Sequence, residues 1–174
     1  MTKPTPLDEE IQLDPKRYIV SETDEKGKIT FANDYFMEVS GYNLDELIGK
    51  PHNVVRHPDM PKVVFKLLWE TISKGKNINA VVKNLAKDGR YYWIFTEFEI
   101  RKDTDTGKII GYHASRKSIS KHVIDVIADL YAELLKIEQT GSVEDSQKYL
   151  VNFLKEKGDD IEFANIMEEI HRFY

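Results

Sequence analysis

The residues with the clearest chemical potential gather in one short segment, residues 49–61. This segment contains His52, Arg56, His57 and Asp59, and a stretch with helical periodicity follows it directly. A helix N-terminus offers free backbone N–H groups and the positive end of a dipole, so Arg56 and His57 beside it could hold an anionic or strongly accepting ligand. In the structural alternative, Asp59 only caps the helix and pairs with Arg56 at the surface. The spacing leaves both interpretations open.

Asn84 is the second candidate, because it brings a polar amide into a strand-like run. Alternation along the strand sends Val82 and Asn84 to the same face of a sheet. A side-chain amide offers a donor and an acceptor together, which matches the edge of a flavin's pyrimidine ring, where an N–H lies between two carbonyls. In the structural alternative, Asn84 lies near a strand end and bonds to the backbone.

The remaining aromatic and titratable residues give weaker signals. Trp69 and Trp93 could pack around a planar cofactor, but their positions in a helical and a strand-like segment favour the core. The five histidines lack the spacing of metal ligands, so we expect no metal site. A haem could take one axial histidine, and His57 is the best-placed candidate. Because the sequence has no phosphate-binding glycine loop, no nucleophile elbow and no close carboxylate pair in a plausible cleft, it does not predict an enzyme.

The elements that must position these residues begin with a hairpin and a series of short helices. Two strand-like runs, 18–24 and 29–33, are joined by a turn at Gly27. Short helical segments follow and end at Gly41 and Gly49. The residues that can cap these helices are Asn33, Asp34 and Asn43.

A longer helix and three more strands complete the order. The helix has Asp59 as its expected N-cap and Pro61 in its first turn, and it ends at Gly75. The three strand-like segments are 78–86, 91–101 and 108–119. This order predicts an α+β class with an antiparallel sheet, one face of which packs against helices. A sheet cupped by helices makes a pocket.

The chain of 174 residues is long enough for one well-buried core with terminal elements. We divide it into a polar leader at 1–17, a folded domain at 18–119 and a helical extension at 120–174. The leader is expected to be loose, with local docking. The extension predicts three helices, the last at 161–174, whose apolar stripes suit packing on the domain, pairing with a second copy or contact with a partner's helix.

Charge and composition exclude several classes of partner and chemistry. The net charge is −5 and no run of Lys or Arg could follow a phosphate backbone, which argues against nucleic acid and anionic membranes. Zero cysteines exclude disulfides and cysteine nucleophiles. Without an apolar stretch of bilayer length or a signal-peptide pattern, we expect a cytoplasmic protein that does not insert into the membrane.

Several strings of the sequence resemble one family. The strings are Asn33-Asp34-Tyr35-Phe36, Val39-Ser40-Gly41-Tyr42, Leu47-Ile48-Gly49-Lys50-Pro51-His52-Asn53, Val55-Arg56-His57-Pro58-Asp59-Met60-Pro61, Val82-Lys83-Asn84, Lys87-Asp88-Gly89 and Tyr92-Trp93. They resemble the PAS domains of bacterial aerotaxis (energy-taxis) sensors, the Aer/CetB type, over about residues 21–116. The string from Arg56 to Pro61 is far more specific than a general PAS pattern.

The resemblance implies both a fold and a function. The implied fold is a PAS fold, a five-stranded antiparallel sheet flanked by short helices and one long helix, here with a C-terminal helical extension. Members of this family bind FAD without a covalent bond, read the redox state of electron transport, and signal rather than turn over a substrate. The family's flavin-associated positions correspond here to Asn33, Arg56, His57, Asp59, Trp69 and Asn84.

Two departures from the family shape the expectation. A Trp expected near the flavin is Ile78 in this chain, so affinity and redox potential could differ. The family's membrane anchor and signalling region are absent, which favours a signal passed in trans to a membrane-bound chemoreceptor or other signalling protein, with a homodimer as a further option. The sequence could equally be a piece of a longer receptor.

Other functions stay open beside this one. A haem-binding gas sensor would use His57 as its axial ligand. A cofactor-free PAS interaction module would fill the pocket with its own side chains, and Ile78 favours that alternative. A flavin oxidoreductase ranks last.

Overall fold

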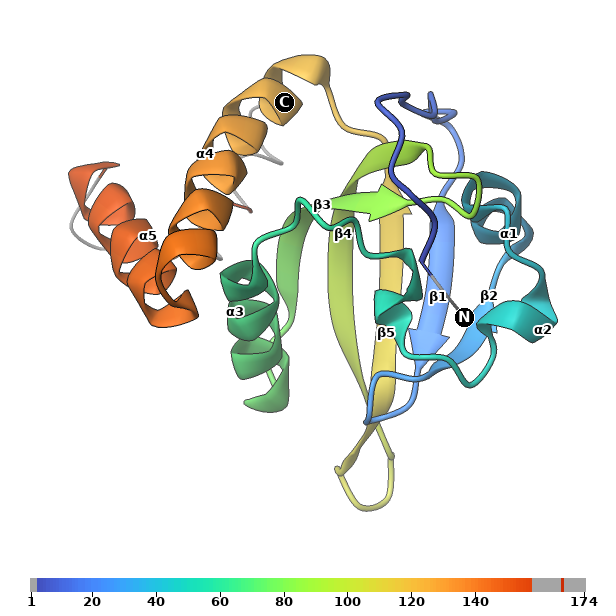
Figure 1. Cartoon of the computed structure of the whole chain (residues 1–174). Coiled ribbons are helices and arrows are strands. Elements are labelled where there is room, and N and C mark those ends of the chain that lie inside the picture. Colours follow the sequence, from blue (N-terminus) through green and yellow to red (C-terminus); the bar gives the residue numbers. More distant parts are fainter. Residues whose placement is uncertain (1–2, 158–166, 168–174) are drawn as a thin grey trace.

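The computed structural model describes residues 3–157 and Met167. One five-stranded sheet forms its centre, with helices on its flanks (Figure 1). The elements in chain order are β1 (Ile19–Thr23), β2 (Ile29–Ala32), α1 (Asp34–Ser40), α2 (Leu44–Leu47), the 3-10 helix η1 (His52–Val55), α3 (Lys62–Ser73), β3 (Ile78–Leu85), β4 (Tyr91–Lys102), β5 (Ile109–Lys117), α4 (Lys121–Thr140) and α5 (Val143–Lys157).

The strands lie in the order β2-β1-β5-β4-β3, and each paired neighbour is antiparallel. The register places Ala114 of β5 opposite Ser21 on one side and Phe98 on the other. Because residues paired directly across neighbouring strands point to the same side, these three residues share one face of the sheet. The predicted α+β class, with a five-stranded antiparallel sheet, short helices and one longer helix before β3, is confirmed.

The short helices begin and end as their sequences predict. The side chain of Asn33 caps α1 by accepting from the backbone N–H of Phe36, and α1 ends at Gly41, whose φ of 72° favours glycine. Asn43 and Glu46 form a capping box on α2. These caps fix the path of the chain toward η1.

The predicted N-cap of the longer helix is wrong. α3 begins at Lys62, after Pro61, and has no side-chain cap of its own. Instead the carboxylate of Glu138 on α4 accepts from the backbone N–H groups of Lys62 at 2.8 Å and Val63 at 2.9 Å. The start of α3 is therefore completed by the C-terminal extension.

The N-terminal leader docks on the domain through backbone contacts, as the local docking allowed for in the sequence analysis would have it. Leu7 donates its backbone N–H to the carbonyl of Gly89, and Ile11 donates to Tyr91. Tyr91 in turn donates to Glu9, and the backbone at 10 and 91 forms a parallel bridge. The leader thus lies beside the β3–β4 turn.

The C-terminal extension packs on the domain beyond the β3 edge of the sheet (Figure 1). The Tyr131 hydroxyl of α4 donates to the carbonyl of Val81 at 2.7 Å, and its ring lies 6.3 Å from that of Trp93. The predicted stripe of α4 is buried at Val123, Ile127, Leu130 and Leu134. The helix predicted at 161–174 lies outside the described residues except for Met167, which is buried.

Among the described residues, no helix combines the length and the apolar character that crossing a bilayer requires.

Candidate cofactor pocket

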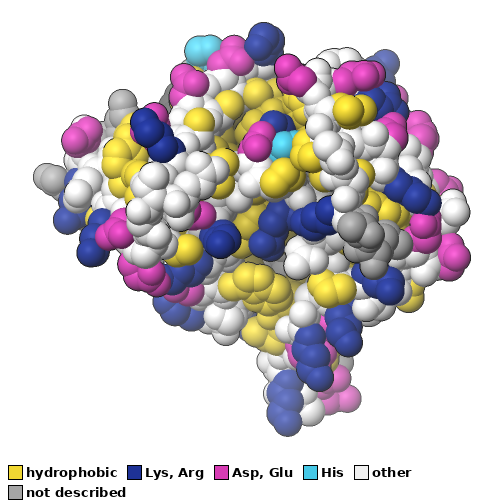
Figure 2. Space-filling view, in the orientation of Figure 1, with side chains coloured by type: hydrophobic (Ala, Val, Ile, Leu, Met, Phe, Trp, Pro, Cys, Tyr) yellow, Lys and Arg dark blue, Asp and Glu magenta, His cyan; other side chains and the backbone are white. Residues whose placement is uncertain are grey.

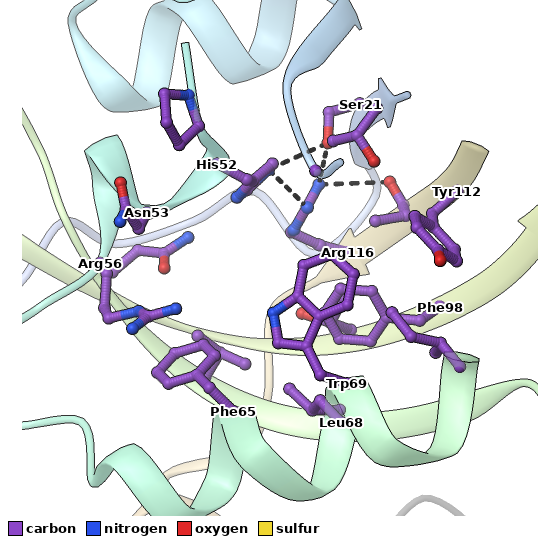
Figure 3. A pocket seen from close by; sticks show the side chains of 18 of the residues that line it. Ser21, His52, Asn53, Arg56, Phe65, Leu68, Trp69, Phe98, Tyr112 and Arg116 are labelled. Carbon is purple, nitrogen blue, oxygen red and sulfur yellow. Dashed lines mark hydrogen bonds between the residues drawn. The ribbon is translucent and has the colours of Figure 1, made fainter. Parts of the chain in front are cut away.

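A cavity of about 290 Å³ lies between α3, the inner face of the sheet and the segment that contains η1 (Figure 3). This volume is close to the lower end of the range typical of small-molecule sites, roughly 300–1,000 Å³. Much of the wall is apolar and aromatic. Its apolar members are Phe65, Leu68, Trp69, Ile72, Val82, Phe98 and Tyr112.

The two tryptophans have different environments. Trp69 is 42% exposed, lines the cavity and meets the ring of Tyr112 edge to face at 5.7 Å. Gly27 lies so close that a Cβ there would be 3.0 Å from the Trp69 ring. Trp93 is buried beneath α4. The core expectation is therefore confirmed for Trp93 and wrong for Trp69.

Asn84 lines the cavity together with Val82, so the predicted shared face is confirmed. The Asn84 side chain is buried, and its Nδ2 donates to the hydroxyl of Tyr92 at 3.5 Å, the long end of hydrogen-bond distances. Its bond is thus to another side chain and not to the backbone. The amide has capacity left for a ligand.

Arg56 lines the cavity from the segment opposite Asn84, and the two residues form an isolated backbone bridge. The Arg56 guanidinium lies 3.5 Å from the ring centre of Phe65. Its Nε is buried without a hydrogen-bond partner among the described residues, and burial lowers the pKa of Arg56. The surface pairing of Arg56 with Asp59 is wrong, since Asp59 pairs with Lys83 at 2.8 Å.

Thr96 carries a second buried polar atom that lacks a partner among the described residues. Its side chain is fully buried, it lines the cavity, and its Oγ1 makes no hydrogen bond there. Leaving a buried polar group unpaired costs about 1–3 kcal/mol, so a polar ligand or water is expected at such a position. Together with Asn84 and Arg56, Thr96 makes the wall suitable for a flat molecule with a polar edge.

A buried polar cluster forms another part of the wall. Arg116 of β5 donates to the Ser21 hydroxyl at 3.0 Å, to the carbonyl of Ala114 at 3.2 Å and to Nε2 of His52 at 2.8 Å. Ser21 also bonds to the same His52 nitrogen at 3.1 Å. Burial lowers the pKa of Arg116 to about 10, and burial and the Arg116 charge hold the pKa of His52 well below its usual range.

Sequence reasoning did not select Ser21 or Arg116. A signal was present, because Arg116 is in phase with Tyr112 and Ala114 along β5, which places its charge on the inner face.

Asn33, His57 and Asp59 do not line the cavity. Asn33 is occupied by structure, since its Oδ1 accepts from two backbone N–H groups and its Nδ2 donates to the carbonyl of Tyr18. His57 is buried, and its Nδ1 accepts from the backbone N–H of Asp59 at 3.1 Å. Burial, with the charge of Lys83, lowers the pKa of His57 to about 4.

The structure therefore brings Arg56, Trp69 and Asn84 together at the cavity, whereas the other three predicted residues are not part of its wall. A haem ligated by His57 lacks geometric support, because the ring does not reach the cavity wall. Of the two interpretations left open for residues 49–61, an anion site at the start of α3 lacks support, since Glu138 already accepts from those N–H groups. Ile78 is buried opposite Phe98 and does not line the cavity.

A family model described as the PAS fold matches residues 29–115, half of the chain. This chain belongs to the PAS family. The match begins at β2 and ends within β5, so this PAS domain includes most of the cavity wall.

Among curated proteins, this PAS chain is 43% identical over 118 residues to the aerotaxis receptor of Escherichia coli (strain K12), covering 67% of this chain and 22% of the receptor. It is 29% identical over 83 residues to the biofilm dispersion protein BdlA of Pseudomonas aeruginosa, covering 47% of this chain and 20% of that protein. The predicted resemblance to the aerotaxis type is confirmed. The chain spans about a fifth of the length of these two relatives.

Solved structures with a similar fold include light-oxygen-voltage domains. One, from work on a flavin analogue, has a TM-score of 0.56 and 18% identity, covering 64% of this chain and 83% of that one. The blue-light photoreceptor Aureochrome1 LOV in its light state has a TM-score of 0.53 and 24% identity, covering 72% and 92%. At these identities the likeness shows a shared PAS fold and nothing finer.

Proposed function

We propose that this chain is a cytoplasmic, FAD-binding PAS redox sensor of aerotaxis that signals without catalysis. Its signal would pass in trans to a membrane-bound chemoreceptor or other signalling protein, with a homodimer as a further form. The observation that carries the proposal is the cavity, which combines aromatic walls with the polar groups of Asn84, Arg56 and Thr96. The 43% identity to an aerotaxis receptor supports the biological setting.

The residues around the cavity fit a flavin ring. Phe65, Trp69 and Tyr112 offer aromatic faces and edges for a planar ring, and the buried Thr96 hydroxyl and Asn84 amide offer donors and acceptors to its polar edge. Bound FAD would supply a group that takes up and releases electrons. The absence of cysteine from the sequence excludes the cysteinyl adduct on which light-sensing PAS relatives depend.

The protein's own contribution would be to link a change in the hydrogen bonds of Asn84 to a change in the position of the C-terminal extension. Asn84 lies on β3, whose backbone bridges to Arg56 and whose Val81 carbonyl accepts from Tyr131 of α4. A change in what the amide donates or accepts would favour one arrangement of β3 and its neighbours over another. α4 is then the element that carries the change outward.

A visible absorbance spectrum of the freshly purified protein tests the cofactor, followed by heat release and chromatography of any chromophore. We expect a two-band yellow spectrum and released FAD. A Soret band would replace the proposal with a haem sensor. A colourless protein that refuses added FAD would leave the cofactor-free interaction module.

The Asn84→Ala variant tests the site itself. It should lower the affinity for FAD at least tenfold while the secondary structure stays intact, because a good hydrogen bond to a ligand contributes about 1.4 kcal/mol or more. Asn152→Ala, at an exposed position of α5, is the matched control and should bind as the unmodified protein does. Equal affinity in both variants would remove Asn84 from the site.

A further inference from the structure

Arg116 is a buried cation whose hydrogen bonds go to neutral groups. Its side chain is 3% exposed, and its partners are a hydroxyl, a backbone carbonyl and an imidazole. Among the described residues, no carboxylate forms an ion pair with it. Burying a charge without a counter-ion is unfavourable. We therefore expect a negatively charged or strongly accepting group in the cavity to offset this free-energy cost.

The guanidinium also has hydrogen-bonding capacity left. A guanidinium carries five N–H donors, and the three hydrogen bonds of Arg116 leave two of them for another acceptor. Figure 3 shows the Arg116 side chain beside the aromatic wall, between His52 and Trp69. Because Arg116 lines the cavity, a molecule bound there can accept from the remaining donors.

The charge of the whole cavity wall has the same sign. The described wall includes Lys26, Arg56 and Arg116 and has no Asp or Glu, although the chain as a whole carries a net charge of −5. In the space-filling view, dark-blue Lys and Arg side chains lie next to an apolar area near the middle of this face (Figure 2). A cavity lined by cations favours ligands that are negatively charged or become so.

His52 and Ser21 hold Arg116 in place. His52 stacks on Phe36 with ring centres 5.7 Å apart, and its Nε2 accepts from Arg116. The Ser21 hydroxyl bonds both to Arg116 and to the same His52 nitrogen. The guanidinium is thus anchored on two sides, which fixes where its charge acts.

We propose that Arg116, positioned by His52 and Ser21, makes this cavity bind the anionic form of an aromatic ligand in preference to the neutral form. The inference rests on the proposed function in one respect, since it takes FAD as the natural ligand. A neutral flavin ring that accepts two electrons and one proton becomes a monoanion, and a second proton would neutralise it. Arg116 stabilises the monoanion without that second proton and so raises the reduction potential.

The first experiment compares Arg116→Gln and Arg116→Lys with the unmodified protein, using dithionite as the reductant. Arg116→Gln should lose at least tenfold of its preference for reduced over oxidised flavin, which for a two-electron couple lowers the potential by about 30 mV. Arg116→Lys keeps the charge and should stay close to the unmodified value. Arg90→Gln, at a partly exposed arginine outside the cavity, is the control. An unchanged potential in a flavin-loaded Arg116→Gln protein would overturn the proposal.

The second experiment needs no flavin and therefore separates this proposal from the proposed function. The apo-protein is titrated with anilinonaphthalene sulfonate and with phenylnaphthylamine, which has the same aromatic rings but no charge. The unmodified protein should prefer the sulfonate, and Arg116→Gln or Arg116→Met should reduce that preference at least tenfold with phenylnaphthylamine affinity retained. His52→Gln should reduce the same ratio, because it frees the guanidinium to turn away.

Circular dichroism tests whether each variant is folded. If Arg116→Gln and Arg116→Met are unstable, Arg116→Lys provides the folded comparison. Equal affinity of the unmodified protein for the two probes would overturn the charge preference, whether or not FAD binds. A charge preference in a protein that never holds FAD would refute the proposed function alone.

Discussion

At the scale of single residues, the cavity is defined by polar atoms that the chain itself does not satisfy. Thr96 Oγ1 and Arg56 Nε are both buried without partners among the described residues. A native fold keeps few such atoms, and each calls for an explanation in terms of function or bound solvent. Here both belong to residues of the same cavity wall.

Thr96→Val should change apo-protein stability and ligand affinity in opposite directions. Valine has the same shape but no hydroxyl, so the free energy of unfolding of the apo-protein should rise by about 1 kcal/mol. FAD affinity should fall about fivefold or more, because the hydroxyl no longer bonds to the ligand. Urea denaturation of the apo-protein and FAD titration measure the two quantities.

Thr30→Val, at an exposed position of β2, is the control and should change both quantities little. A fall in both stability and affinity for Thr96→Val would mean that the hydroxyl supports the fold and not the ligand.

Residue-level sequence reasoning succeeded where the side chain's direction follows from strand alternation. Asn84 lies on the cavity face because Val82 does. The same rule applies to Arg116, but an arginine in a strand is usually a surface residue, so alternation alone does not single it out. His57 and Asp59 lie in an irregular segment, where no periodicity tells which side chains turn toward the cavity.

At the scale of elements, the start of α3 depends on a residue far away in the sequence. Glu138 accepts from two backbone N–H groups of α3, and its Oε1 also accepts from the Ser146 hydroxyl of α5. One carboxylate thus joins three helices. α3 also supplies Phe65, Leu68 and Trp69 to the cavity wall.

Glu138→Ala should lower the free energy of unfolding by about 1–2 kcal/mol, the usual effect of losing a helix cap. It should also speed amide hydrogen exchange at Lys62 and Val63, whose N–H groups lose their acceptor. Glu133→Ala, at an exposed site of the same helix, is the matched control. Unchanged exchange at Lys62 and Val63 would show that the cap contributes nothing in solution.

The sequence could not reveal this cap. Asp59 and Pro61 match the local pattern of a helix start, so the pattern predicted a cap at Asp59. The observed partner of Lys62 is 76 positions further along the chain. Local patterns located the helix correctly, whereas its capping group depended on how α4 packs.

At the scale of the whole molecule, two histidines with lowered pKa values, the buried His57 and the half-buried His52, should make the fold sensitive to acid. Burial holds the pKa of His57 at about 4 and that of His52 well below 6.5. The unfolded chain, with ordinary histidines, therefore binds more protons than the folded chain between about pH 4 and pH 6.5. Stability is fully present above pH 6.5 and falls as the pH drops through this window.

We expect the free energy of unfolding to fall between pH 7 and pH 5, with His57 contributing on the order of 1–2 kcal/mol of that fall. Urea denaturation at the two pH values measures this difference. His57→Asn should make the difference smaller, because it removes the buried histidine whose pKa is about 4. A stability that stays constant from pH 7 to pH 5 would contradict the pKa assignments.

The global fold was predictable because it follows from patterns that are local and repeated. Strand alternation, glycine turns and helix caps located the elements, and strings such as the one from Arg56 to Pro61 resembled a known family. The docking of the leader beside Tyr91 was harder to foresee, since residues 3–17 are polar and the contact uses backbone groups. Backbone pairing leaves little trace in side-chain type.

The carboxylate of Glu138 also matters for building chimeric proteins that contain this PAS domain. A chimeric protein that includes only residues 18–119 would keep all of α3 but lose Glu138. The backbone N–H groups of Lys62 and Val63 would then have no capping carboxylate. A junction placed after α5 keeps the donor and acceptor in one piece. A segment transferred to another protein should therefore extend through α5, beyond residues 29–115 that the PAS family model matches.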